Sequence, residues 1–291
     1  MKPLYAFAAL LLVLFAALAL YLGAHPPALL SPQGLIALNE RSLMFHAVEL
    51  MLIVVIPVLF LAFYFAWHYR AGNTKALYTP EWEHSKMDEL VWWAVPLEIV
   101  LILAALTWSS THELDPKAAL PQNLGTPLTV EVVALPWKWL FIYPSLGVAS
   151  LNALTLPANR PVTFEITADA PMNSFWIPAL GGQIYAMTGM VTMLNLIAQE
   201  PGAYAGGSAN YSGDGFAYMH FTATALPPAE FDAWAARLRL SSSTLGIPEY
   251  RALETPGAGS VAYYGAVAPN LFDTIVAQFV LPSQAAAMDM H

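Results

Sequence analysis

Three apolar segments near the N-terminus divide the chain into a membrane part and a water-soluble part. They run from Leu4 to Leu22, from Leu50 to Trp67 and from Leu90 to Trp108. At 1.5 Å per helical residue, the second and third each span roughly 27 Å, close to the thickness of a bilayer core. We therefore predict a transmembrane hairpin over residues 25–112, with helices at about 43–69 and 88–110. The first segment, within residues 1–24, is either a signal peptide or an uncleaved helix, because it follows Lys2 and ends in small residues.

Beyond a Pro-rich linker over residues 111–127, the hydrophobic positions repeat every second residue. Val162, Phe164 and Ile166 alternate with polar residues, as they do in strands that have one buried face. Several short segments of this kind predict an antiparallel β-sandwich or barrel over residues 113–226. Helical spacing returns at 228–239 and after Asn270, so residues 227–291 are predicted to form a C-terminal helical extension and a tail. The fold class is thus membrane α plus all-β.

Basic residues predict the orientation of the hairpin. The loop between the two long apolar segments contains Arg70, Lys75 and Lys86, and loops with such residues stay on the cytoplasmic side. The β-rich domain after residue 112 is then on the outer side of the membrane. This conclusion holds whether or not the first apolar segment is cleaved.

The composition of the chain argues against several classes of function. Hydrophobic residues make up 57% of the chain and charged residues only 11%, whereas soluble domains carry roughly a quarter charged residues. The net charge is −9 and the basic residues form no cluster, so nucleic acid is not an expected partner. The sequence has no cysteine, which excludes disulfides, iron–sulfur ligation and cysteine-based zinc sites.

Two apolar helices before an outer β-domain resemble subunit II of the haem–copper respiratory oxidases. The resemblance covers almost the whole chain after the first segment. Its most specific stretches are VVALPWKWLFIYP (residues 132–144), APMNSFWIPALGGQIYAMTGM (170–190) and YAGGSANYSGDGFAYMHF (204–221). The resemblance implies a cupredoxin-like fold for the outer domain.

In the cytochrome c oxidases of this family, the outer domain holds two copper ions through thiolates, imidazoles, a thioether and a carbonyl. Soft thiolates suit such a centre because they stabilise Cu(I). The resemblance places these ligand positions at Asn173, near Gly207 and Tyr211, and near Gly215, with Met219 one residue out of register. An amide, two glycines and a phenol cannot replace thiolates and imidazoles. The resemblance therefore implies the quinol-oxidising branch of the cytochrome bo type, with no metal or other cofactor in this chain.

The resemblance implies a subunit II without a redox centre, in a proton-translocating complex that oxidises ubiquinol and reduces oxygen to water. Haems and copper are expected in the partner subunit I, and other oxidase subunits and membrane lipid are further partners. The expected location is the bacterial inner membrane, with the large domain in the periplasm. Two alternatives remain at this point: a membrane-anchored copper electron carrier of the cytochrome c oxidase type, and a non-catalytic cupredoxin-like assembly or binding module.

Glu89 is the candidate for a proton entrance. It lies at the cytoplasmic start of the third apolar segment, where the family has a Glu at the mouth of a proton channel. The alternative role is that of an acid in the first turn of a helix, which Asp88 would fill equally well. Elsewhere, Trp137 and Trp139 are predicted to lie on one face of a strand and to serve in packing.

Overall fold

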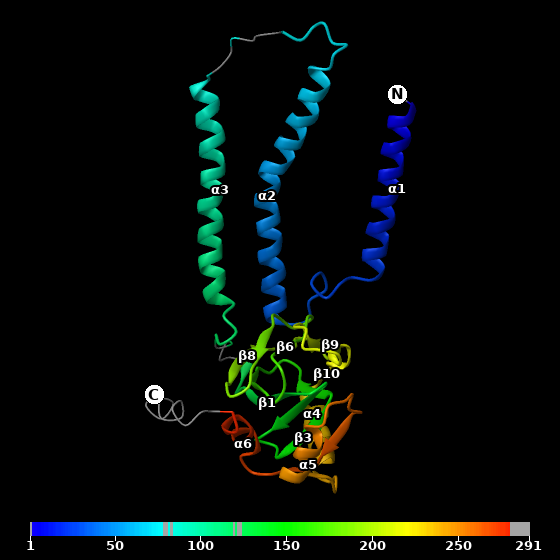
Figure 1. The fold of residues 1–291 in the computed structure, drawn as a ribbon, viewed down its shortest axis with the longest axis vertical. Helices are drawn as coiled ribbons and strands as arrows, with labels where there is room; N and C mark the ends of the chain where they lie inside the picture. Colours follow the sequence, from blue (N-terminus) through cyan, green and yellow to red (C-terminus); the bar gives the residue numbers. More distant parts are fainter. Residues whose placement is uncertain (1, 78–80, 82–83, 119, 121–123, 280–291) are drawn as a thin grey trace. The chain divides into compact units, whose positions relative to one another are not determined.

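The computed structural model describes residues 2–77, 81, 84–118, 120 and 124–279. It begins with three helices, α1 (Lys2–Ala24), α2 (Leu35–His68) and α3 (Lys86–Glu113) (Figure 1). Both α2 and α3 are long and apolar enough to cross a membrane. The structure begins α2 well before residue 43 and extends α3 past residue 110, because polar turns continue each helix beyond its apolar part.

Two sheets form the outer domain. The six-stranded sheet has the order β12-β3-β2-β1-β5-β8, the five-stranded sheet has the order β4-β10-β9-β6-β7, and β11 pairs with β13 alone. The strands are β1 (Leu128–Leu135), β2 (Lys138–Tyr143), β3 (Val148–Leu151), β4 (Ala153–Pro157), β5 (Val162–Ala168), β6 (Asn173–Trp176), β7 (Ile184–Ala186), β8 (Thr192–Leu196), β9 (Gly202–Ser208), β10 (His220–Leu226), β11 (Thr244–Leu245), β12 (Ala262–Tyr264) and β13 (Ala266–Val267).

The predicted sandwich is confirmed, but it is not purely antiparallel. Strand β1 pairs in parallel with β5, and β4 pairs in parallel with β10. Parallel neighbours need a crossover connection rather than a tight turn. Periodicity reveals which residues share a face, but it does not reveal which strands become neighbours.

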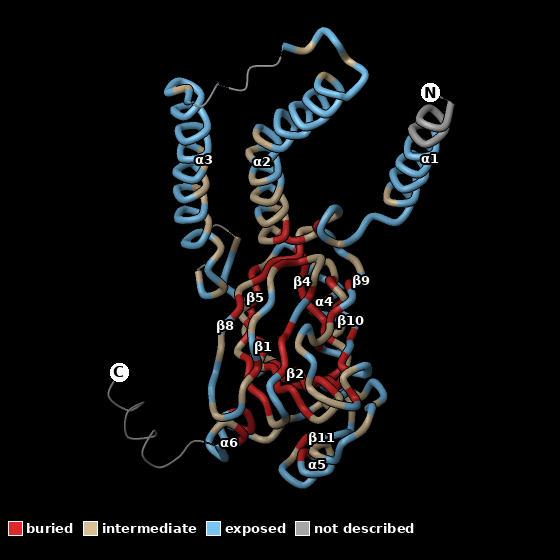
Figure 2. The backbone as a smooth tube through the Cα atoms, turned by 45° about the horizontal axis from the view of Figure 1, so that its top comes forward, coloured by how far each residue is buried: buried red, intermediate tan, exposed pale blue. Residues whose placement is uncertain are grey.

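The middle of the six-stranded sheet, in β2, β3 and the end of β1, is buried on both faces, as Figure 2 shows for β1 and β2. Val130 and Val132 point into the core between the two sheets, as the alternation predicts. Val133 and Leu135 point to the opposite face, where they pack in a second core. The apolar run at the end of β1 follows from this, since a strand covered on both sides has no need of polar positions.

The C-terminal extension supplies the cover for the second core. It contains α4 (Pro228–Arg239), α5 (Ile247–Leu253) and α6 (Leu271–Ala277). Tyr250 from α5 and Leu271, Phe272 and Ile275 from α6 pack against the sheet. The prediction of α4 and α6 is confirmed, whereas α5, which has a proline in its first turn, was not predicted. The predicted tail falls on residues 280–291, outside the described part of the chain.

The segment that leads into α2 is fastened to the outer domain by backbone hydrogen bonds. The amides of Gln33 and Gly34 donate to the Ala179 carbonyl over 2.7 and 3.0 Å, and the Gln199 amide donates to the Gln33 carbonyl over 2.9 Å. Ala37, in the first turn of α2, is only 3% exposed. We call residues 33–37 and their partners 179–180 and 198–199 the N-terminal clasp.

Gly34 is the point of closest approach in the N-terminal clasp. A β-carbon at this position would overlap the backbone of Leu180, which has little freedom to move. We predict that Gly34→Ala lowers the free energy of unfolding of the outer domain by about 1–3 kcal/mol, the usual cost of overpacking. Gly72→Ala is the control, because a β-carbon at Gly72 meets no atom within 4 Å. Urea unfolding of the detergent-purified chain, followed by tryptophan fluorescence, measures both, and equal effects would contradict the prediction.

Candidate functional site

The site that the sequence suggests is the loop Ser208–Met219, which connects β9 to β10. Its last turn is a short 3-10 helix, η2 (Phe216–Tyr218). Asn173, the first of the predicted positions, begins β6 and is 1% exposed. The pairing of β6 with β9 brings Asn173 beside the start of the loop. The loop and β6 together therefore form one local site.

Ser208 connects the loop to β6. Its hydroxyl donates to Asn173 Oδ1 over 3.0 Å and accepts from the backbone amide of Ser174 over 3.3 Å. Asn173 Nδ2 donates to the Pro171 carbonyl over 2.7 Å, so both ends of its amide are satisfied. A second tie comes from Asn210, whose Nδ2 donates to the Met172 carbonyl over 3.1 Å. Neutral hydrogen bonds thus hold the first half of the loop in place.

The structure does not bring Gly207 and Tyr211 to Asn173 as side-chain neighbours. Gly207 faces His220 across the antiparallel β9–β10 ladder. The Tyr211 side chain is 72% exposed, and its ring lies 5.6 Å from that of Phe216. Ser208 is the residue beside Asn173, so the contact falls one position after Gly207. The resemblance could not decide whether position 207 or 208 lies beside Asn173, because the loop has no cysteine or histidine with which to align the family's ligand positions.

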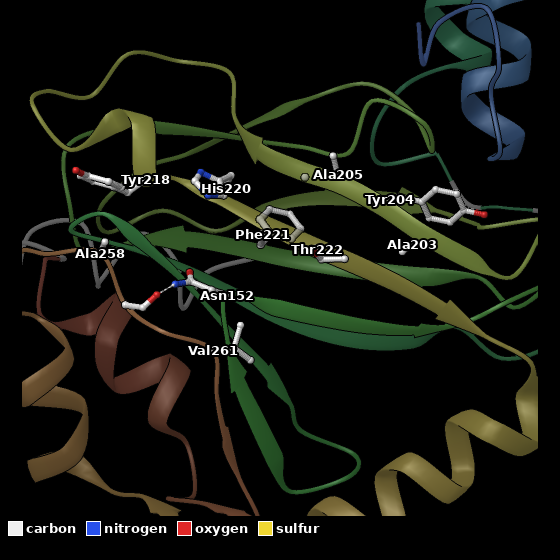
Figure 3. Close-up of a pocket in the computed structure, with 12 residues that line it drawn as sticks. Asn152, Ala203, Tyr204, Ala205, Tyr218, His220, Phe221, Thr222, Ala258 and Val261 are labelled. Carbon is white, nitrogen blue, oxygen red and sulfur yellow. Dashed lines mark hydrogen bonds between the residues drawn. The ribbon is translucent and has the colours of Figure 1, made fainter. Parts of the chain in front are cut away.

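Met219 and His220 lie on opposite sides of the chain, as predicted. Met219 is 2% exposed and belongs to the core between the sheets, and its carbonyl accepts a hydrogen bond from the Trp139 indole over 3.4 Å. His220 is exposed and lines a groove of about 570 Å³ together with Tyr218, Asn152 and Thr222 (Figure 3). The Met219 thioether and the His220 imidazole are therefore not placed to bind the same metal ion.

Gly215 lies beneath the indole ring of Trp137. A β-carbon at Gly215 would overlap this ring, and one at Gly213 would lie 2.9 Å from its Cη2 atom. Trp137 is in the turn between β1 and β2, so its predicted place in a strand is wrong. Its ring packs against the same core as Trp139, which agrees with the predicted packing role.

The chemistry of these side chains is that of neutral oxygen and nitrogen donors. Asn173 and Ser208 already satisfy each other, and the Ser212 hydroxyl is buried without a hydrogen-bond partner. The described residues contain no group of three or more His, Asp or Glu side chains placed to hold a metal ion. Soft, redox-active metals favour thiolate and imidazole ligands, which this loop does not supply.

Lys138 and Glu131 are two of the titratable groups in the outer domain whose pKa values are shifted. Burial lowers the pKa of Lys138, whose Nζ donates to the Thr255 carbonyl over 2.8 Å. Burial, together with the nearby carboxylates of Glu165 and Asp273, raises the pKa of Glu131 to about 7. Glu131 and Asp273 line one cavity of about 260 Å³ beside α6. Neither group belongs to the loop or contacts Asn173.

An uncharged stretch with exposed apolar side chains was not predicted from the sequence. No charged residue occurs between Asp169 and Glu200, although this stretch contains β6, β7 and β8. Several large apolar side chains in it are exposed, and the five most exposed are those of Met172, Trp176, Tyr185, Met190 and Val191. We call these five residues the uncharged face. The absence of charge over so long a stretch of a water-exposed domain is the signal that could have revealed it.

Glu89 lies in the first turn of α3. Its side chain is 48% exposed, and a carboxylate oxygen lies 3.9 Å from Nδ1 of His84. The helix is capped by Ser85, whose hydroxyl accepts from the Asp88 amide over 3.3 Å. Asp88 and Glu89 are both acids of the first turn, so helix capping alone does not distinguish them.

Comparisons with known proteins agree on the family of the chain. The family described as "Cytochrome C oxidase subunit II, periplasmic domain" matches residues 128–226, and "COX Aromatic Rich Motif" matches residues 239–283. The chain is 48% identical to the cytochrome bo(3) ubiquinol oxidase subunit 2 of Pseudomonas putida, covering 86% of this chain and 80% of that one. It is 46% identical to its Pseudomonas aeruginosa counterpart (90% and 79% covered) and 47% identical to the ubiquinol oxidase subunit 2 of Acetobacter aceti (86% and 82% covered).

Two serines in the loop provide a matched test of the hydrogen-bond network. Ser208→Ala should lower the free energy of unfolding by about 1–3 kcal/mol, because it leaves the buried groups of Asn173 and Ser174 without their partner. Ser212→Ala should cost nothing or stabilise slightly, because the hydroxyl that it removes is buried and unpaired. Urea unfolding of both variants measures the difference. A larger loss for Ser212→Ala than for Ser208→Ala would contradict the network.

Proposed function

Because this chain belongs to the family of ubiquinol oxidase subunits 2, it is a subunit of a terminal quinol oxidase, and we propose that it serves there without a redox centre of its own. The complex oxidises ubiquinol, reduces oxygen to water and translocates protons across a bacterial inner membrane. The haems and the copper belong to subunit I. This chain stabilises subunit I, covers its periplasmic side and forms part of the cytoplasmic proton entrance.

The observation that carries the proposal is the donor set of the loop. Ser208 at the start of the loop and Asn173 in β6 are hydrogen-bonded to each other, and the chain has no thiolate. Neutral amide and hydroxyl groups neither stabilise Cu(I) nor couple two metal ions electronically. Electrons then have no route through this domain. A quinol dissolved in the bilayer can instead deliver them directly to the membrane-embedded subunit.

The uncharged face is the surface that we assign to contact with subunit I. Protein interfaces are enriched in aromatic residues and Met, and their centres are depleted of charge. Met172, Trp176 and Tyr185 meet this description, and the tie from Asn210 to the Met172 carbonyl joins the loop to this face. The residues of the outer domain that the N-terminal clasp contacts, Leu180 and Ala198, also lie in the uncharged stretch between Asp169 and Glu200. The chain therefore enters its first membrane-spanning helix from the same stretch of sequence.

Glu89 is the residue that we assign to the proton entrance. An ionisable side chain at a membrane boundary, partly exposed to water, can pass protons toward a partner subunit. The nearby His84 is also titratable and is exposed on the same side. Asp88 shares the first turn of the helix and serves as the comparison for Glu89.

Purification separates the proposal from its alternatives. An affinity tag on this chain should retain haem absorbance and ubiquinol-dependent oxygen consumption in detergent. Isolation of a colourless chain from membranes that contain active oxidase would instead support an assembly or binding module. About two copper ions per chain, bound to the chain itself, would support a copper electron carrier.

The pair Glu89 and Asp88 tests the proton entrance. Glu89→Gln should slow ubiquinol-driven oxygen reduction by about tenfold or more, because proton delivery then limits turnover. Glu89→Asp should slow it less, since it keeps a carboxylate. Asp88→Asn is the matched control and should leave turnover nearly unchanged. If Glu89→Gln and Asp88→Asn had the same small effect, both acids would serve only the helix dipole.

A further inference from the structure

The turn that carries Trp137 has an unusual backbone. Trp137 has φ of 68°, in the left-handed region that bulky side chains rarely adopt. A residue held in this region persists only where the surrounding contacts outweigh the strain. Pro136 precedes it and fixes its own φ, so the turn offers the indole few alternative directions. The strain indicates that the position of the ring matters.

The indole ring packs against the two glycines of the loop, Gly213 and Gly215. At Gly215, which is buried, a β-carbon would overlap the indole, and at Gly213 it would lie 2.9 Å from the ring edge. Gly213 also has φ of 123°, which favours glycine. The backbone of the loop therefore packs directly against the face of the indole. Only residues without a side chain permit this approach.

The second half of the loop has few other ties to the domain. Within residues 213–218, the backbone hydrogen bonds that the structure shows are local, such as Phe216 to Gly213 and Tyr218 to Gly215. The Ser208 and Asn210 ties act on the first half only. Packing by Trp137 is thus the main contact that joins residues 213–215 to the sandwich.

The C-terminal extension forms hydrogen bonds with the two residues on either side of Trp137. The Gly257 amide donates to the Pro136 carbonyl over 3.4 Å, and Lys138 Nζ donates to the Thr255 carbonyl over 2.8 Å. Both bonds flank Trp137 directly. A continuous series of contacts therefore runs from the segment 255–257 through the turn to the indole, and from the indole to the loop.

We propose that Trp137 is a positioning residue whose indole locks the loop Ser208–Met219 against the sandwich, and that the segment 255–257 holds the indole in place. The lock sets the shape of the loop before any partner binds. If the loop also takes part in the contact with subunit I, next to the uncharged face, that part of the inference rests on the proposed function. The lock itself is a property of this chain alone.

A double-mutant cycle tests the lock. Trp137→Gly removes the ring and suits the positive φ of the turn, so the backbone is not disturbed. Gly215→Ala places a methyl group where the ring lies. Each single change should raise hydrogen exchange at the amides of residues 213–218 by about tenfold or more, without changing exchange in β1 and β2. Gly215→Ala made in the Trp137→Gly background should add almost nothing, because the ring that it would meet is gone.

The exchange measurement uses the detergent-purified full chain and needs no partner. Additive effects of the two changes, or unchanged exchange in the Trp137→Gly loop, would overturn the lock. Faster exchange throughout β1 and β2 in both variants would also overturn it, since the effect would then be global unfolding. Haem retained by tagged Trp137→Gly is a separate readout. Normal retention beside a confirmed exchange cycle would remove the loop from the contact with subunit I and leave the lock intact.

Discussion

The outer domain depends on a loop that is held by neutral contacts. The hydroxyl of Ser208 donates a hydrogen bond to the buried amide of Asn173, and this contact, beside those of Ser174 and Asn210, joins the loop to β6 in the interior of the domain. Such a contact fixes the loop without any charge, ligand or redox change. It also occupies hydrogen-bonding groups of both side chains. An amide whose groups are already hydrogen-bonded has little affinity left for a metal ion. A domain of this kind can be rigid and still be unable to relay electrons.

Charged residues are also absent from a long stretch of the outer domain. The stretch between Asp169 and Glu200 contains both the uncharged face and the attachment points of the N-terminal clasp. Strand β8, at the edge of the six-stranded sheet, receives the other connection as well, since the Asn195 amide donates to the Pro116 carbonyl over 2.9 Å. The two segments that connect the domain to the hairpin therefore cover part of an edge that would otherwise be open to another strand.

Much of this architecture could be predicted from the sequence, because its signals are local. Apolar length predicts α2 and α3, and alternation predicts β1 and β5 with Val130 and Val132 on one face. The second core could not be predicted, because it depends on α5 and α6 returning to the far face of β1 and β2. The parallel pairing of β1 with β5 was missed for the same reason, since it is a fact of topology.

The candidate site was only partly predictable. Asn173 was identified because its surroundings resemble a long family stretch, and the structure places it at the centre of the loop contacts. Ser208 was missed because a serine carries no signal when no neighbouring ligand fixes the register. The left-handed turn at Trp137 was missed because alternation assigns the residue to a strand, and only the backbone shows that the strand has ended.

The choice of electron donor tests the central claim most directly. The purified oxidase complex should be supplied, in parallel, with ubiquinol and with reduced soluble cytochrome c, and oxygen consumption should be measured at low and high ionic strength. The account predicts rapid turnover with ubiquinol and only background oxidation of cytochrome c at either salt concentration. Turnover with cytochrome c that rivals the ubiquinol rate would contradict it, because electrons would then be crossing the outer domain, for which the account proposes no redox centre.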